Sequence, residues 1–374
     1  MRTSLFLIAL LASFSAFSQK YYLFVGTYTN TPAASKGIYV YRFDAATGDA
    51  TLVSTAATEN PSYLALAPDA KYLYAVNETD SPQKPGSVSA FSFDKTTGSL
   101  SFINKQLSGG DDPCFIAVDK QRKYAIVANY SGGNLSALPI RTDGSLAPLT
   151  QLIQHTGTGP NKDRQEKAHV HSTFLSPDQR YLLSADLGLD KISIYKFQPA
   201  NAAHPLASIK DSAYIAPPGS GPRHLAFHPN KPYAYLITEL TGAVEVYHYA
   251  DGHFSPLQHI SSHPEGFKGN IGSADIHITP NGNFLFASNR GDADNLAIFS
   301  IDPATGKLTL KGFESTQGKT PRNFMIDPTG HWLLVANQRS DNVVIFAIDP
   351  KTGLLKPTGK QLKVPAPVCL ITAP

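Results

Sequence analysis

One unit of about fifty residues repeats along this chain of 374 residues, and the repeat limits the fold more than any other feature. Each copy has a proline or its equivalent, an apolar run, a turn, and a short run that begins with an aromatic residue and ends in a polar one. The full copies are NPSYLALAPDAKYLYAVNE (60–78), DPCFIAVDKQRKYAIVANY (112–130), HVHSTFLSPDQRYLLSADL (169–187), PRHLAFHPNKPYAYLITE (222–239), GSADIHITPNGNFLFASNR (272–290) and TPRNFMIDPTGHWLLVANQ (320–338). A half-copy, APVCLITAP, closes the chain.

The repeated runs predict β-strands almost throughout. Runs such as YLYAV (72–76) and WLLVA (332–336) combine aromatic and aliphatic residues over a strand's length, which is typical of strands buried on both faces. Between the copies, segments such as FDAATGD and FDKTTGS pair an Asp with a Gly at turn spacing. Each copy therefore predicts four antiparallel strands.

The two ends of the chain predict a closed ring. The final half-copy has only an inner strand, and YYLFVGTY near the N-terminus overlays KYLYAVNE of the first full copy. Tyr22 to Gly26 would then supply the missing second strand. Seven four-stranded sheets of this kind predict an all-β, seven-bladed β-propeller closed by N-terminal and C-terminal strands.

Composition excludes several classes of protein. Apolar residues make up 42% of the chain and charged residues 16%, so it is not a disordered chain. The net charge of +3 comes from scattered Lys and Arg, without the basic stripe that binds nucleic acid. Cys114 and Cys369 fall in copies that are not neighbours in the ring, and no disulfide is expected.

Residues 1–18, MRTSLFLIALLASFSAFS, have the pattern of a cleaved export signal. A basic residue precedes a short apolar segment, and small residues precede Gln19. The apolar segment is too short to anchor the chain comfortably in a bilayer. We expect a single propeller domain over 19–374, exported to the periplasm or secreted, without membrane insertion after cleavage.

The repeat also predicts where side chains gather. In antiparallel neighbours, the start of the inner strand and the end of the second strand lie at the same edge. The first ring of positions at this edge is Ser62, Cys114, His171, Arg223, Ala274, Arg322 and Val368. The second ring is Tyr28, Glu78, Tyr130, Leu187, Glu239, Arg290 and Gln338.

Charged residues in these rings predict a binding site at one mouth of the central channel. His171, Arg223, Glu239, Arg290 and Arg322 fall on four consecutive blades. One arginine at a strand end is usually a surface residue in a salt bridge. Three arginines and a glutamate at one mouth favour a polar or anionic ligand, because so many charges need partners.

Further histidines and an aspartate accompany the cluster. His169 and His171 have the spacing of two metal ligands on one strand face, but the repeat places no third ligand beside them. The sequence therefore predicts neither a metal site nor a cofactor. His224 reaches a ligand or makes a turn bond, and Asp275, one blade further on, orients Arg223 or Arg290. We count His169, His224 and Asp275 with Arg322 as substrate-binding candidates.

GPRHLAFHPNKPYAYLITEL, ADIHITPNGNFLFASNR and TPRNFMIDPTGHWLLVANQ resemble the lactonase family of seven-bladed propellers, from about residue 20 onward. That family includes bacterial 6-phosphogluconolactonases and fungal carboxy-cis,cis-muconate cyclases. The resemblance implies a catalytic site of His171, Arg223, Glu239 and Arg290, and a small anionic or polyhydroxy lactone as substrate.

Lactone hydrolysis then predicts a role for each residue. Glu239 would activate water as the base, and His171 would protonate the departing alkoxide. Arg223 and Arg290 would hold the oxyanion or a negative group of the substrate, with Arg322 as a further anion contact. A muconate cyclase and a non-catalytic propeller that binds an anionic glycan or a protein are the alternatives. The sequence predicts no oligomeric state.

Overall fold

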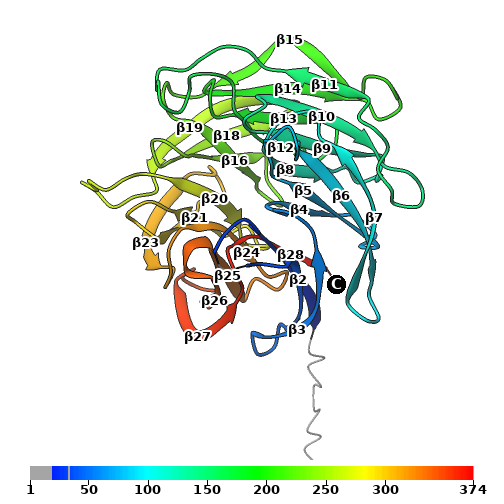
Figure 1. Ribbon diagram of the computed structural model, residues 1–374. Helices are drawn as coiled ribbons and strands as arrows, with labels where there is room; N and C mark the ends of the chain where they lie inside the picture. The colour runs from blue at the N-terminus through cyan, green and yellow to red at the C-terminus, as the bar shows by residue number, and fades with distance from the viewer. Residues whose placement is uncertain (1–18, 33, 374) are drawn as a thin grey trace, which may run out of the picture.

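The computed structural model describes residues 19–32 and 34–373, which form seven four-stranded antiparallel sheets around one axis (Figure 1). The predicted seven-bladed β-propeller is confirmed. The predicted export signal, residues 1–18, lies outside the described residues. In the described part of the chain, no helix is long and apolar enough to cross a membrane.

Blades 1 to 6 follow each other along the chain. Blade 1 contains β4 (Leu64–Leu66), β5 (Tyr72–Asn77), β6 (Ser87–Asp94) and β7 (Ser99–Leu107), and blade 2 contains β8 (Pro113–Val118), β9 (Tyr124–Asn129), β10 (Asn134–Pro139) and β11 (Gln151–Gln154). Blade 3 contains β12 (Val170–Leu175), β13 (Tyr181–Asp186), β14 (Lys191–Phe197) and β15 (Leu206–Ile215), and blade 4 contains β16 (Pro222–Phe227), β17 (Tyr233–Thr238), β18 (Ala243–Ala250) and β19 (His253–Ser261). Blade 5 contains β20 (Ser273–Ile278), β21 (Phe284–Asn289), β22 (Asn295–Ile301) and β23 (Leu308–Ser315), and blade 6 contains β24 (Pro321–Ile326), β25 (Trp332–Asn337), β26 (Asn342–Ile348) and β27 (Leu355–Lys363).

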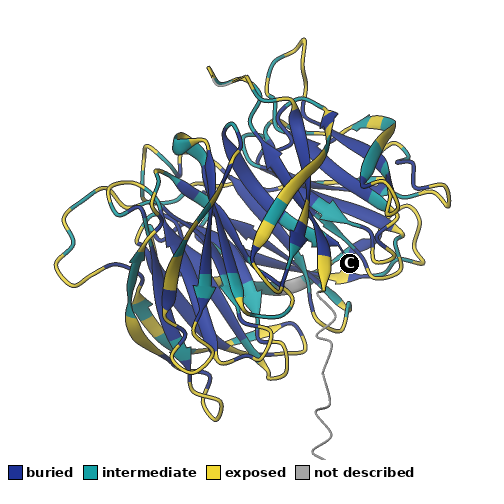
Figure 2. Ribbon diagram, turned by 90° about the horizontal axis from the view of Figure 1, so that it is seen from below, coloured by how far each residue is buried: buried dark blue, intermediate teal, exposed yellow. Residues whose placement is uncertain are grey.

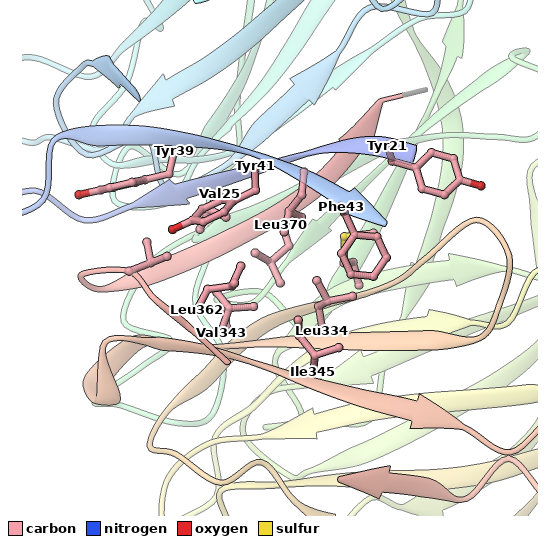
Figure 3. Close-up of a cluster of buried hydrophobic side chains, with 14 of the residues drawn as sticks. Tyr21, Val25, Tyr39, Tyr41, Phe43, Leu334, Val343, Ile345, Leu362 and Leu370 are labelled. Carbon is pink, nitrogen blue, oxygen red and sulfur yellow. The ribbon is translucent and has the colours of Figure 1, made fainter. Parts of the chain in front are cut away.

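Blade 7 joins the two ends of the chain. It contains β28 (Pro367–Ala373), β1 (Lys20–Thr27), β2 (Gly37–Asp44) and β3 (Asp49–Ala57), in that order. β1 pairs with β28 from Tyr22 opposite Ala373 to Thr27 opposite Pro367. The predicted closure is therefore confirmed, and Figure 3 shows the seam it creates with blade 6.

Apolar side chains fill that seam. Phe43 of β2 and Leu370 of β28 pack with Leu334 of β25 and Ile345 of β26, and all four are almost fully buried (Figure 3). Burial of apolar surface is worth about 25 cal/mol per Å², so the seam resists opening although no covalent bond closes it. Figure 2 shows the same organisation over the molecule, with buried residues on the blade strands and exposed residues in loops and on outer strands.

The outer hairpins turn where the Asp and Gly spacing predicts. In blade 7, Gly48 N donates to Asp44 O at 2.8 Å, and Gly48 has a φ of +75°, which favours glycine. Blade 2 differs from the prediction. Its fourth strand begins at Gln151, well after Asp143 and Gly144. The intervening segment pairs through an isolated bridge between Ile140 and Leu146 and through single backbone hydrogen bonds from Ala147 and Thr150.

Candidate active site

The inner strands of blades 2 to 7 each begin with a break in the pairing register. In blades 2, 3, 4 and 6 the residues that the breaks leave without a partner in the ladder are Cys114, His171, Arg223 and Arg322, and in blades 5 and 7 they include Ala274 and Val368. A β-bulge of this kind changes the direction of the side chain that it carries. The first predicted ring therefore coincides with a set of bulges, all at the same end of the inner strands.

Backbone hydrogen bonds hold the second ring at the same edge. Glu239 N donates to Gly221 O at 2.8 Å, and Arg290 N donates to Gly272 O at 3.1 Å. Each of these glycines lies directly before an inner strand, β16 or β20. The two rings are therefore one structure, built from strand starts and strand ends.

Glu239 lies at the centre of a cluster of cations. Its Oε2 accepts a hydrogen bond from Arg223 Nε at 2.9 Å and lies 3.0 Å from Arg290 Nη2. Its Oε1 accepts a hydrogen bond from Arg164 Nη2 at 2.7 Å. The Glu239 side chain is only 7% exposed. Three guanidinium groups therefore neutralise one buried carboxylate.

A cavity of about 270 Å³ opens beside this cluster. Its wall carries three guanidinium groups, three carboxyl groups and one imidazole, which belong to Arg164, Arg290, Arg322, Glu78, Asp112, Glu239 and His171. Arg223 does not line the cavity. It is 1% exposed, and its Nη1 donates to Ala274 O. Its contacts therefore support Glu239 from within the protein.

The charges fix the protonation of Glu239. Burial by itself raises the pKa of a carboxyl group, but Arg290, then Arg223, hold the pKa of Glu239 well below its ordinary value. Glu239 is therefore ionised at neutral pH. Both of its oxygens accept hydrogen bonds from arginines, so the carboxylate is poorly placed to take a proton from water.

The surroundings of His171 favour the neutral form of its side chain. Burial, followed by the charge of Arg223, lowers its pKa well below 6.5, so the imidazole is neutral at neutral pH. Its Nε2 lies 4.0 Å from Glu239 Oε2, and its Nδ1 lies 4.0 Å from Cys114 Sγ. The Nε2 contact is too long for a hydrogen bond, and the Nδ1 contact lies at the upper limit of distance for a weak hydrogen bond to sulfur. The neutral ring is therefore able to accept a proton from a group in the cavity.

Arg322 lies on another part of the cavity wall. Its guanidinium is over the Tyr28 ring, 5.5 Å from the centroid, and its Nη2 is 3.9 Å from Glu78 Oε1. Tyr28 Oη donates to the same Glu78 oxygen at 2.8 Å. Glu78 Oε2 is buried without a hydrogen-bond partner. Arg322 and Glu78 thus present a cation and an acceptor side by side.

His224 and Asp275 belong to a different cavity. This second cavity, of about 380 Å³, lies along β16 and β20 and is bounded by Pro229 and Pro280, beyond the far ends of those strands. His224 Nδ1 is 2.8 Å from Asp275 Oδ1, and His277 Nε2 is 3.0 Å from Asp275 Oδ2.

Asp275 therefore contacts two histidines, and also Asn323, instead of Arg223 or Arg290. The sequence placed His224 and Asp275 with the substrate-binding residues, but neither side chain lines the cavity of Glu239.

His169 is also set back from the cavity. Its ring stacks on Tyr130 at a centroid distance of 4.5 Å, and its Nε2 is 3.0 Å from Glu166 Oε1. Although it is two residues from His171, it positions Tyr130 on the wall. Among residues 19–32 and 34–373, no group of three or more His, Cys, Asp or Glu side chains converges in a way that could hold a metal ion.

The family is decided by comparison with known proteins. Residues 22–372 match the model of a lactonase family described as a seven-bladed β-propeller. The chain belongs to this lactonase family. A 6-phosphogluconolactonase of Formosa agariphila is 40% identical to it over 85% of this chain and 90% of that protein.

Two further relatives align with almost the whole of this lactonase. A 6-phosphogluconolactonase of Bacillus subtilis is 36% identical over 94% of this chain and 98% of its own length. The structure of the periplasmic gluconolactonase of Pseudomonas aeruginosa superposes with a TM-score of 0.90 at 38% identity, over 95% of this chain and 99% of that one.

Sequence reasoning missed two charged groups on the cavity wall, Arg164 and Asp112. Arg164 lies in the segment between β11 and β12, outside the repeat, so no ring position includes it. The ring positions did include Tyr130, Glu78 and Cys114, but these were not chosen as site residues. Cys114 Sγ donates to His171 O at 3.2 Å, and burial raises the pKa of its thiol, so it is not a nucleophile at neutral pH.

Proposed function

We propose that this chain hydrolyses sugar δ-lactones of the 6-phosphogluconolactone type to the corresponding aldonic acids. Its relatives include two 6-phosphogluconolactonases and a periplasmic gluconolactonase. The observation that carries the proposal is the position of the His171 imidazole on a cavity wall shared with three arginines, its Nε2 4.0 Å from Glu239 Oε2 and therefore not hydrogen-bonded to it.

The electrostatics favour an exchange of the roles first expected for Glu239 and His171. Neutral His171 takes a proton from water as the water oxygen attacks the lactone carbonyl. The imidazolium that forms lies 4.0 Å from Glu239, whose negative charge stabilises it. The imidazolium then gives the proton to the ring oxygen when the carbon–oxygen bond breaks. The products are a carboxylic acid and a free hydroxyl group.

The arginines on the wall are suited to the charge that develops during the reaction. Arg290 and Arg322 line the cavity and can donate to the oxyanion of the tetrahedral intermediate. Arg223 is buried behind Glu239, and we assign it the positioning of that carboxylate in place of direct contact with the oxyanion.

The carboxyl groups on the wall favour a polyhydroxy substrate over a polycarboxylate. Glu78 and Asp112 line the same cavity as the arginines. A carboxylate accepts hydrogen bonds from sugar hydroxyls, whereas it repels the several carboxylates of a muconate.

The test is a substrate panel offered to purified residues 19–374. Glucono-δ-lactone and 6-phosphogluconolactone are followed by proton release against an enzyme-free blank, and carboxymuconate is followed by loss of its diene absorbance. We expect hydrolysis of at least one lactone well above the blank and a stable diene. Failure to accelerate either lactone would refute the proposal.

We further propose that residues 1–18 are removed during export and that the mature chain is periplasmic or secreted. A periplasmic relative of similar length supports this location. Fractionation of expressing cells, followed by N-terminal sequencing, should find the chain outside the cytoplasm and beginning near Gln19. A cytoplasmic chain that still carries Met1 would contradict it.

A further inference from the structure

Three arginines contact Glu239, and Arg164 differs from the other two in the acceptors of its hydrogen bonds. Arg223 and Arg290 each donate to a backbone carbonyl as well, Ala274 O and Gly272 O respectively. Arg164 donates only to side chains, Tyr130 Oη at 3.1 Å and Glu239 Oε1 at 2.7 Å. Its side chain is 43% exposed, against 2% for Arg223 and 15% for Arg290.

The backbone that carries Arg164 is nevertheless well anchored. Gln165, the next residue, is fully buried, and its Nε2 donates to Leu187 O and to Asp190 Oδ1, both at 2.8 Å. Its backbone N donates to Asn161 O at 2.7 Å. The segment therefore holds a long, partly exposed guanidinium at a fixed point on the cavity rim.

Glu239 does not depend on Arg164 for neutralisation. Arg223 and Arg290 both contact Oε2, and Arg164 alone contacts Oε1. When Arg164 turns away, the carboxylate keeps two cationic partners. An arginine prefers a phosphate or a free carboxylate that it can bind through two parallel N–H groups, so an anionic group in the cavity competes well for it.

We propose that Arg164 is the specificity-determining residue for an anionic group on carbon 6 of the lactone. In the structure its guanidinium contacts Glu239 and Tyr130, and with substrate bound it pairs with the phosphate or carboxylate at carbon 6. This inference rests on the proposed lactonase function. It adds to that function the residue that separates anionic lactones from neutral ones.

The test compares Arg164→Met and Arg164→Lys with a matched control, Lys167→Met, on three substrates. Lys167 is an exposed cation of the same segment, and its Nζ donates to Ser131 O without lining the cavity. The substrates are 6-phosphogluconolactone, with a phosphate on carbon 6, glucarolactone, in which carbon 6 is the carboxylate carbon, and glucono-δ-lactone, with a hydroxyl group on carbon 6.

In Arg164→Met we expect kcat/KM to fall about 10- to 100-fold for the anionic lactones and less than about threefold for glucono-δ-lactone. Arg164→Lys should lie between wild type and Met, and Lys167→Met should match wild type. A loss confined to 6-phosphogluconolactone identifies phosphate as the anion, and a loss confined to glucarolactone identifies carboxylate. Equal losses on all three substrates, or no loss on any, would overturn the proposal.

A binding measurement separates this inference from the lactonase function. Inorganic phosphate should raise the melting temperature of wild type and Lys167→Met more than that of Arg164→Met. If wild type hydrolyses no lactone, the proposed function fails, and this difference still decides whether Arg164 binds anions. Equal stabilisation of all three proteins by phosphate would exclude an anion site at Arg164.

Discussion

Two buried carboxylates lie in neighbouring blades, Glu239 directly after β17 and Asp275 on β20, and their partners are of different kinds. Glu239, beside the smaller cavity, contacts three arginines, whereas Asp275, beside the larger one, contacts two histidines. The two groups are connected, because Arg223 Nη1 lies 3.3 Å from His224 Nε2. Arginine stays charged at any physiological pH, and histidine does not.

The difference in partners gives separate properties to the region around the smaller cavity, called here the Glu239 end, and to the region around the larger cavity, called the Asp275 end. At the Glu239 end, fixed positive charge surrounds a neutral imidazole, which suits stabilisation of an oxyanion over a wide pH range. At the Asp275 end, burial lowers the pKa of His224, and Arg223 lowers it further, to about 4. Burial also opposes the charged form of His277, but Asp275 outweighs it and raises the pKa of His277. We therefore expect activity to depend on the first end and pH-dependent stability on the second.

The largest expected effect is a loss of activity. It is tested by substituting one histidine from each end, His171 and His277. His171→Asn should lower kcat/KM by about 10²- to 10⁴-fold, because it removes the group that moves the proton. His277→Asn should stay within about threefold of wild type, because His277 does not line the cavity of Glu239.

The pH profile of wild type tests the assigned role of His171. If neutral His171 is the base, kcat/KM rises as pH rises through the lowered pKa of His171 and is flat above pH 6.5. If His171 acts first as the acid, kcat/KM falls over the same window. A blank at each pH is subtracted because lactones open spontaneously. A falling profile, or normal activity in His171→Asn, would contradict the assignment.

The next effect is a loss of unfolding free energy, which we compare between Glu239→Gln and Asp275→Asn. Glu239→Gln leaves buried Arg223 without its carboxylate, and breaking a buried pair in this way costs about 3–5 kcal/mol. Asp275→Asn should cost only about 1–3 kcal/mol, because His224 is already neutral at pH 7 and His277 can lose its proton. Urea unfolding at pH 7 measures both.

Phosphate serves as the control for this comparison. It should stabilise Glu239→Gln more than wild type, because an anion replaces the missing charge beside the arginines. Equal unfolding free energies for the two variants would remove the distinction between the carboxylates.

Much of this organisation follows from the repeat, and the reason is geometric. The end of YLIT and the start of PRHL meet because antiparallel neighbours share an edge, so Glu239 and Arg223 could be paired from sequence. The closure by β1 and β28 followed from half-copies at the two ends.

The repeat could not predict which way side chains point at the bulges. Arg223 is left out of the ladder and turns towards Glu239, whereas the adjacent His224 turns towards Asp275. A regular strand pattern does not contain that shift. Arg164 was missed for a different reason. It comes from a segment outside the repeat, where position in the sequence says nothing about position around the ring.

The smallest of the three effects is the pH dependence of stability at the Asp275 end. The pKa of His224 is about 4 in the folded protein and about 6.5 in the unfolded chain. Between these values the unfolded chain binds the proton and the folded protein does not, so stability falls as pH falls from 6.5 to 4. The share of His224 is about 3 kcal/mol over that window. Urea unfolding of wild type and His224→Gln at pH 7, 6, 5 and 4.5 should show a shallower decline in the variant. Parallel declines would mean that His224 is not held neutral by its burial beside Arg223.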